Sequence, residues 1–216
     1  MSVDYNNFAK TFSNSRKKMK WEEIEYFLDY IKLEKNIDIL DIWCWNWRLL
    51  WELLNSNLNI WNYLWIDLSS WLLTEAKKQY SNYNFLELNM TNIDKIDWKF
   101  DVIFFIASFH HLDNIDNRLE TLKKAYSLLN KWWKIFFTNW ALDSKLNFDK
   151  YNKSIIKWSE NKFWSTDYDI KIGEYFRYYH CFNLLELEYL FTKSWFKIME
   201  NKLFKNEKNY ISIIEK

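Results

Sequence analysis

Residues 41–48, Asp41-Ile42-Trp43-Cys44-Trp45-Asn46-Trp47-Arg48, form the stretch on which the fold assignment depends. The apolar run 37–42 that leads into it is too short for a helix and predicts a buried strand. The segment 48–55 that follows predicts a helix. In an open parallel sheet, ligands bind beyond the carboxyl ends of the strands. The junction at 43–47 is therefore the first candidate binding site.

The same alternation of strand and helix continues on both sides of this junction. An amphipathic helix is expected from Trp21 onward, since Ile24, Phe27, Leu28 and Ile31 share one helical face. Further strands are expected at 62–67, 84–88, 100–108, 134–139, 196–204 and 210–214, and further helices at 69–80, 116–129 and 184–192. This order predicts an α/β, Rossmann-like doubly wound sheet of seven strands. The sheet is mostly parallel, ends in a C-terminal antiparallel hairpin and has helices on both faces.

A chain of 216 residues is long enough for one domain with a sizeable core. We therefore expect a single domain over 1–216, with an N-terminal helical segment at 1–35 and an insertion at 140–175. The regular pattern lapses within this insertion until about residue 174. Long irregular segments in compact domains are often functional.

Charge and cysteine content limit the other classes of function. Thirty Lys and Arg against 29 Asp and Glu leave a net charge of +1, which excludes a strong global attraction to nucleic acid. Any RNA binding needs a local patch. The two cysteines cannot form a disulfide framework, and no apolar run approaches the roughly 20 residues that cross a bilayer. A cytoplasmic protein without a membrane partner is expected.

The balance of glycine and tryptophan is unusual. Ordinary chains contain about 7% glycine, yet this chain has one glycine, 15 tryptophans and no proline. Where a strand turns sharply into a helix against a ligand, the backbone needs positive φ and no Cβ. Trp43, Trp45 and Trp47 do not meet that requirement.

With glycine in place of these three tryptophans, the stretch becomes Asp-Ile-Gly-Cys-Gly-Asn-Gly-Arg. It then resembles the cofactor motif of class I S-adenosylmethionine-dependent methyltransferases of the type 11 group. The same exchange fits Trp65, Trp132, Trp133 and Trp195, where this family commonly has glycine. We hypothesise that the source organism reads the codon UGA as glycine and that a different translation table reads it as tryptophan. The alternative is that the tryptophans are genuine.

The resemblance implies S-adenosyl-L-methionine as cofactor. It places the cofactor-binding residues at Asp41, Trp43, Cys44, Trp45, Asn46, Trp47, Asp67, Leu68, Asn89, Met90, Ala107 and Ser108. Asp41 is expected near the methionine end, Asp67 at the ribose hydroxyls and Asn89 at adenine, although the last two residues also fit helix caps. A dinucleotide-binding dehydrogenase is the competing interpretation, but its fingerprint is G-x-G-x-x-G rather than G-x-G-x-G.

Three stretches narrow the resemblance further: 12–16 (Phe-Ser-Asn-Ser-Arg), 108–111 (Ser-Phe-His-His) and 176–180 (Phe-Arg-Tyr-Tyr-His). With 139–142 (Asn-Trp-Ala-Leu), they are similar to the methyltransferases that esterify 5-carboxymethyluridine at the tRNA wobble position. The resemblance implies tRNA as a partner and a small zinc-binding protein as an activator. It covers nearly the whole chain.

A carboxylate acceptor is already ionised, so positioning and charge dominate its methylation. The catalytic candidates are Arg177, Tyr178, His180 and His111, and the substrate-binding candidates are Arg16, Phe109 and Tyr179. Arg177 is expected to bind a carboxylate or phosphate bidentately, and an aromatic ring to stack on a base. In the alternative, the histidines cap the cofactor pocket and the tyrosines are core aromatics.

No metal site is expected, because no carboxylate or cysteine completes a recognisable ligand set around His110, His111 and His180. Three functions remain open at this level. The first is carboxylate methylation on tRNA, and the second is methylation of a small molecule by a type 11 enzyme. The third is an inactive scaffold, because genuine indoles at 43, 45 and 47 would overpack the cofactor site.

Overall fold

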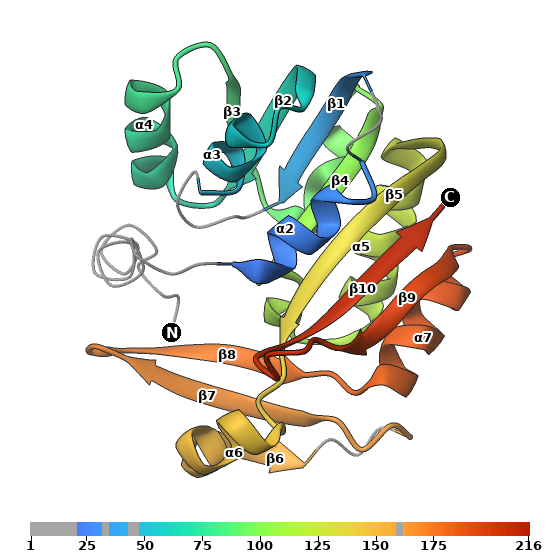
Figure 1. Ribbon diagram of the computed structural model, residues 1–216. Helices are drawn as coiled ribbons and strands as arrows, with labels where there is room; N and C mark the ends of the chain where they lie inside the picture. Colours follow the sequence, from blue (N-terminus) through green and yellow to red (C-terminus); the bar gives the residue numbers. More distant parts are fainter. Residues whose placement is uncertain (1–20, 32–34, 43–47, 159–161) are drawn as a thin grey trace.

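The computed structural model describes residues 21–31, 35–42, 48–158 and 162–216. Figure 1 shows a large twisted sheet with helices against it and a separate small sheet on the side toward which the parallel strands run. The large sheet has seven strands in the order β3-β2-β1-β4-β5-β10-β9. The small sheet has the order β6-β7-β8. The N-terminal and C-terminal halves of the chain therefore share one main sheet.

Parallel pairing joins β1 to β2 and β4, β2 to β3, and β4 to β5, whereas β10 pairs antiparallel with β5 and β9. The seven strands of the main sheet are β1 (Lys35–Ile42), β2 (Asn59–Asp67), β3 (Asn84–Glu87), β4 (Phe100–Ile106), β5 (Leu129–Trp140), β9 (Lys197–Leu203) and β10 (Asn209–Glu215). The predicted α/β class, the seven strands and the antiparallel end of the sheet are confirmed.

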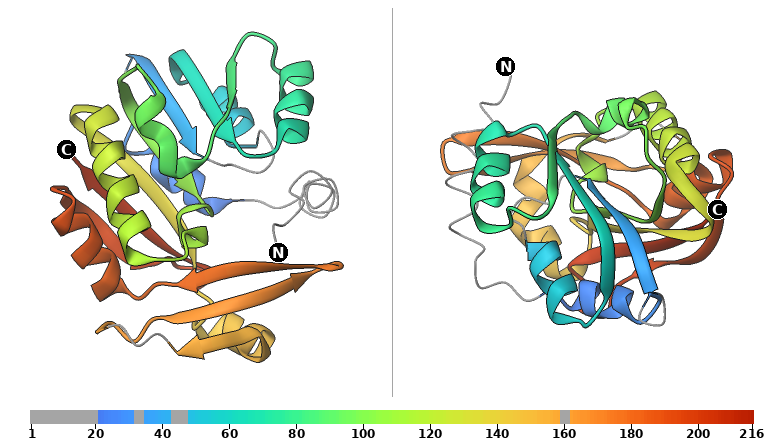
Figure 2. Two further views of the ribbon diagram at one scale, coloured as in Figure 1. Left: turned by 180° about the vertical axis from the view of Figure 1, so that it is seen from behind. Right: turned by 90° about the horizontal axis from the view of Figure 1, so that it is seen from above.

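Helices cover both faces of the main sheet (Figure 2). The first face packs against α2 (Glu22–Leu28), α3 (Arg48–Asn55) and α4 (Ser70–Gln79). The second packs against the short helix η1 (Met90–Lys95), α5 (Ile115–Leu128) and α7 (Leu184–Lys193). Along β4, Ile103 and Phe105 point to the second face while Phe104 and Ile106 point to the first. The most hydrophobic predicted strand is thus buried on both sides, as a central parallel strand should be.

The predicted irregular insertion is in fact largely regular. It contains α6 (Lys145–Tyr151), the turn η3 (Asn152–Ser154), β6 (Ile155–Trp158), β7 (Thr166–Ile172) and β8 (Tyr175–Cys181). The sequence prediction was wrong here because β7 buries consecutive residues, and so residues on both faces, and therefore lacks a simple alternation of polar and apolar side chains. Elsewhere the differences are confined to the ends of elements, such as β5, which begins at Leu129 rather than 134.

Three tryptophans have a left-handed backbone: φ is 71° at Trp132, 58° at Trp164 and 69° at Trp195. Such values are uncommon outside glycine and are outliers for a bulky side chain. Trp65 and Trp133 do not share this conformation in the described backbone. Trp65 instead lies 1% exposed in the core against α2, α3 and α4. The four positions outside the 43–47 loop at which the sequence suggested glycine, 65, 132, 133 and 195, are therefore not equivalent.

Candidate active site

The carboxyl ends of β1, β2 and β4 lie at one edge of the main sheet. From β1 the chain continues to β2 and β3 on one side, and later returns to β4 and β5 on the other. The order of strands therefore reverses between β1 and β4, and ligands of open α/β sheets bind beyond such a switch point. The side chains at this edge define the candidate site.

Asp41 is fully buried near the end of β1. The hydroxyl of Tyr63 donates to its Oδ2 at 2.5 Å, whereas its Oδ1 has no hydrogen-bond partner among the described residues. Burial raises the pKa of Asp41 to about 8, and the nearby Asp67 charge adds to this effect against the opposing hydrogen bond from Tyr63. A buried carboxyl oxygen without a donor suits a ligand that brings a positive or N–H group.

Asp67 ends β2 and is also buried. Its Oδ1 accepts from the backbone N–H of Ser69 at 2.8 Å, and Ser69 caps α4 by accepting from Leu72 N at 3.2 Å. The predicted adenine contact, Asn89, caps η1 through Oδ1 and the N–H of Thr91 at 3.0 Å. Both residues thus hold the local turn at the expected edge, and their contacts with a cofactor stay predictions.

The end of β4 turns sharply after Ile106. Ala107 has φ 50°, and its N–H donates to both the carbonyl and the hydroxyl of Thr138 in β5. Ser108 follows with its side chain fully buried. The other predicted pocket residues differ in depth: Leu68 is half-buried and Met90 is buried in the core.

The short helix η2 (Phe109–His111) places two histidines beyond this turn. The backbone N–H of Trp140 donates to His110 Nδ1 at 3.2 Å, and His111 Nδ1 lies 2.8 Å from the Tyr178 carbonyl oxygen. Because a carbonyl only accepts, His111 donates from Nδ1. Burial, with the charges of Arg177 and His110, holds the pKa of His111 well below its ordinary value. His111 is therefore neutral at physiological pH.

One face of β8 meets these histidines. Arg177 is 3% exposed, with its guanidinium carbon 5.7 Å from the centroid of the Tyr179 ring. Tyr179 also stacks on Trp140 at 4.9 Å and contacts the His110 and His111 rings at 5.1 and 4.6 Å. The structure thus brings together the predicted residues Arg177, Tyr179 and His111 as a cation within an aromatic cluster.

The opposite face of β8 carries Tyr178 and His180 into a buried polar network. His180 Nδ1 lies 2.7 Å from Asp167 Oδ1, and its Nε2 lies 2.9 Å from Glu186 Oε2. Glu186 also pairs with Arg118 at 3.3 Å. Although burial alone raises the pKa of Glu186, the hydrogen bond from His180 holds it below its ordinary value. His180 therefore lies between two carboxylates, each within hydrogen-bond distance of one of its ring nitrogens.

Tyr178 joins the same network, since its hydroxyl donates to Asp167 Oδ1 at 2.8 Å. Together these contacts tie β7 and β8 to α5 and α7. Tyr178 and His180 therefore anchor the small sheet, and the catalytic role predicted for them stays a prediction. Phe109 is fully buried against Phe105, Phe137 and Phe182, which favours the core alternative over stacking on a substrate base.

Several predicted residues lie outside the described part of the chain: Arg16, Trp43, Cys44, Trp45, Asn46 and Trp47. The described residues contain no group of three or more His, Cys, Asp or Glu that could hold a metal. No helix in the described ranges is long and apolar enough to span a membrane.

Sequence reasoning missed Tyr63, Arg118, Asp167 and Glu186. Each is a polar residue that the sequence pattern predicts to face solvent in a helix or strand. Its role becomes visible only through a hydrogen-bond or ion-pair partner in another part of the fold. Nothing in their local sequence identifies them. Asn139 was quoted only as part of a motif, yet it is fully buried and its amide has no hydrogen-bond partner among the described residues.

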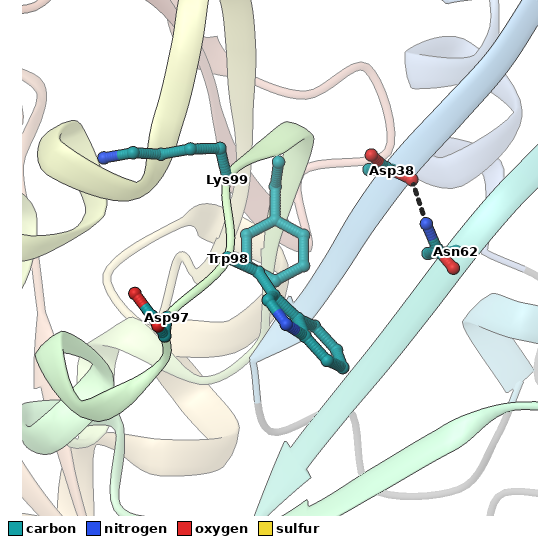
Figure 3. Close-up of a pocket in the computed structure, with 6 residues that line it drawn as sticks. Asp38, Asn62, Asp97, Trp98 and Lys99 are labelled. Atoms are coloured by element: carbon teal, nitrogen blue, oxygen red, sulfur yellow. Dashed lines mark hydrogen bonds between the residues drawn. The ribbon is translucent and has the colours of Figure 1, made fainter.

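A hollow at the opposite end of the strands is separate from this edge (Figure 3). It is lined by Asp38, Asn62, Asp97, Trp98, Lys99 and Phe100. Two of its polar side chains pair with each other, since Asn62 Nδ2 donates to Asp38 Oδ1 at 2.8 Å. It lies at the amino-terminal side of β4, away from the switch point, and is not the candidate site.

Comparison with known proteins agrees with this geometry. Residues 40–131 match the family described as "Methyltransferase domain". They span β1 to the start of β5 and include Asp41, Asp67 and the histidines of η2.

Over residues 40–131 the chain is similar to this methyltransferase family.

Solved structures share the fold of this chain. An S-adenosylmethionine-dependent methyltransferase from Clostridium acetobutylicum has TM-score 0.66 and 16% identity, covering 98% of each chain. A 1,6-didemethyltoxoflavin N1-methyltransferase from Burkholderia thailandensis, with bound S-adenosylhomocysteine, has TM-score 0.67 and 14% identity over 99% of this chain and 84% of that one. No curated protein matches the sequence.

The match over residues 40–131 and the shared fold support the predicted enzyme class, a methyltransferase that uses S-adenosylmethionine as its cofactor. The residues of this edge fit that cofactor, because Asp41 Oδ1 lacks a donor among the described residues and the cofactor carries an amino group. Asp41 and Asp67 would hold it at this edge, and that role stays a prediction. Bound S-adenosylmethionine supplies an electrophilic methyl group on a positively charged sulfur.

The raised pKa of Asp41 predicts a pH-dependent stability of the methyltransferase without cofactor. Because the folded state holds this proton up to about pH 8 and the unfolded state releases it near the ordinary value of 3.8, stability falls as pH rises between these limits. Asp41→Asn removes the dependence. We expect it to raise the unfolding free energy by roughly 2–5 kcal/mol at pH 8 and little at pH 4. Urea unfolding at both pH values measures this, and an equal effect at both would contradict it.

The buried network predicts a large cost when its central ring is lost. His180→Phe leaves Asp167 and Glu186 as buried carboxylates without their shared donor, and we expect a loss of about 3–5 kcal/mol in unfolding free energy. Tyr178→Phe removes one hydroxyl from the same network and should cost about 1 kcal/mol. Denaturant unfolding of both variants provides the comparison. Equal small losses would show that His180 is not the centre of the network.

Proposed function

We propose that this methyltransferase transfers the methyl group to an anionic oxygen acceptor bound between η2 and β8, with Arg177 as its counter-charge. The observation that supports this proposal is the burial of the Arg177 guanidinium, at 3% exposure, beside Tyr179 and His111. A planar guanidinium binds a carboxylate or phosphate bidentately and fixes its orientation. Low exposure strengthens that interaction.

The chemistry asks little of the protein beyond positioning. An ionised carboxylate oxygen attacks the methyl carbon in line as the carbon–sulfur bond breaks, and no proton has to be removed. Arg177 orients the carboxylate, and the neutral His111 adds no competing charge next to it. Tyr179, stacked on Trp140, offers a rigid aromatic wall for a planar substrate.

The finer proposal is that the methyl acceptor is the carboxylate of a modified wobble uridine in tRNA. It is supported by the resemblance in 176–180 and 108–111 and by the place of Arg177, Tyr179 and Trp140 in one cluster. Exposed lysines on α6 and its neighbours, Lys145, Lys150, Lys153 and Lys162, supply a local positive surface that a near-neutral chain needs for RNA. On this proposal the protein works in the cytoplasm, and a small zinc-binding protein acts as its activator.

A small-molecule acceptor is the second candidate. The toxoflavin enzyme from Burkholderia thailandensis, whose fold this chain shares, was solved with bound 1,6-didemethyltoxoflavin. In this chain the stacked rings of Tyr179 and Trp140 offer an aromatic wall to such an acceptor. On this alternative Arg177 binds the acid group of a metabolite instead of a nucleotide.

Methyl transfer to tRNA separates the two candidates. With labelled S-adenosylmethionine, we expect wild-type protein to label a tRNA fraction in an alkali-labile ester, and added salt to weaken the reaction steeply. Arg177→Gln should lower kcat/KM by about 10²–10³-fold, since it removes a charge-assisted bidentate contact. Lys153→Gln on the exposed surface is the matched control and should change it only a few-fold. Label in a metabolite extract but not in tRNA would favour the second candidate.

An inactive scaffold is the third candidate, and it follows if the tryptophans at 43, 45 and 47 are genuine. We propose instead that these positions are glycine in the natural protein and that UGA is the codon there. The support is the motif itself, in which glycine lets the backbone approach a ligand.

Calorimetric titration with S-adenosylmethionine tests this proposal. We expect the chain as written to bind weakly or not at all, and the variant with Trp43, Trp45 and Trp47 replaced by glycine to bind in the micromolar range. Asp41→Asn in the glycine variant should remove most of that binding. If the chain as written binds equally well, glycine at these three positions is not required for binding. If a folded glycine variant does not bind, the proposal is contradicted.

A further inference from the structure

The three tryptophans with positive φ occupy turns in which glycine is the ordinary residue. The clearest is Trp195, which follows α7. Its N–H donates to the carbonyl of Thr192 at 3.2 Å, and the N–H of Phe196 donates to the carbonyl of Phe191 at 3.1 Å. With Ser194 as C-cap, this pair of bonds is the Schellman motif. In this motif the residue directly after the C-cap, here Trp195, is left-handed and usually glycine.

Trp132 lies where β5 bulges away from β4. Between two successive pairings, β4 advances from Phe100 to Val102 while β5 advances from Leu129 to Lys134. The extra residues of β5 form the bulge, and the N–H of Trp132 donates to the terminal carbonyl of Lys216 at 3.1 Å. A left-handed residue in a bulge is commonly glycine, because it has no Cβ to clash with the carbonyl oxygen.

Trp164 lies in the turn that leads into β7, with φ 58°. Sequence comparison with the methyltransferase motifs did not single it out. Its indole is 81% exposed, and those of Trp132 and Trp195 are 67% and 62% exposed. Indoles usually bury most of their surface. The packing of these three exposed indoles therefore does little to offset the energetic cost of their left-handed backbone.

Trp140 provides the contrast within the same chain. It is half-buried, stacks on Tyr179 and has no left-handed backbone in the described structure. The structure therefore distinguishes a tryptophan that packs against its neighbours, Trp140, from tryptophans at positions whose backbone conformation favours glycine. Of the other non-glycine residues with positive φ, Asn36 and Asn57 are of the type that tolerates it.

We infer that glycine is the native residue at positions 132, 164 and 195, whereas tryptophan is native at 140. A codon that the source organism reads as glycine and that is translated here as tryptophan accounts for the three exchanges together. This inference rests on backbone geometry in the described residues and is independent of the cofactor loop and of the methyl acceptor. It also differs from the sequence hypothesis, because the backbone gives no reason for glycine at Trp65 or Trp133.

Thermal unfolding of single variants tests the conformational part. Trp132→Gly, Trp164→Gly and Trp195→Gly should each raise Tm by roughly 2–4 °C, because a left-handed bulky residue is relieved. The alanine variants at the same positions keep a Cβ and should raise it by less. Trp51→Gly, at a half-exposed position inside α3, is the matched control and should lower Tm by roughly 2–4 °C. Gains from alanine equal to those from glycine would overturn the conformational argument.

Sequencing the gene and the protein from its natural source tests the inference directly. We expect UGA at codons 132, 164 and 195 and UGG at codon 140. Trypsin releases residues 163–171 as one peptide, and its mass should correspond to glycine at position 164. UGG at the three codons, or tryptophan in that peptide, would overturn the inference, whatever the outcome of cofactor titration.

Discussion

Parallel pairing of β1 with β2 on one side and β4 on the other is the constraint on which the site depends. It brings the ends of three strands that are distant in the sequence to one edge of the sheet. Asp41, Asp67 and Ser108 therefore all lie at that edge. The same pairing buries Asp41 and raises its pKa. Hydrophobic packing of helices on both faces maintains the sheet, and Asp41 and Asp67 lie where their strands end.

The small sheet depends on a different kind of interaction. Its connection to the rest of the molecule passes through buried ions, with His180 between Asp167 and Glu186 and with Arg118 beyond. Such a network gives little net stability over an apolar core, but it accepts only one geometry. The position of β8 relative to η2, and hence that of Arg177 relative to the cofactor edge, follows from it.

The order of strands and helices in the main sheet was predictable because apolar runs such as 100–106 have a length and composition that only a buried strand satisfies. The cofactor edge was predictable from Asp41 and Asp67, which end such runs. The small sheet was not, since 155–181 shows no clean period while its strands bury residues on both faces. Arg118, Asp167 and Glu186 were not predictable either, because a charged residue becomes internal only through partners that its local sequence does not reveal. Arg118 and Glu186, for example, pair although they lie 68 residues apart in the sequence.

The alternation along β8 separates two properties of the molecule. Arg177 and Tyr179 face the histidines of η2, where the proposal places the acceptor, and Tyr178 and His180 face the buried polar network. On that proposal, substitutions at the odd-numbered positions change which compound is modified, whereas substitutions at the even-numbered positions disturb the attachment of the small sheet. A single seven-residue strand would in this way let acceptor preference diverge among descendants of this gene while the architecture stays fixed.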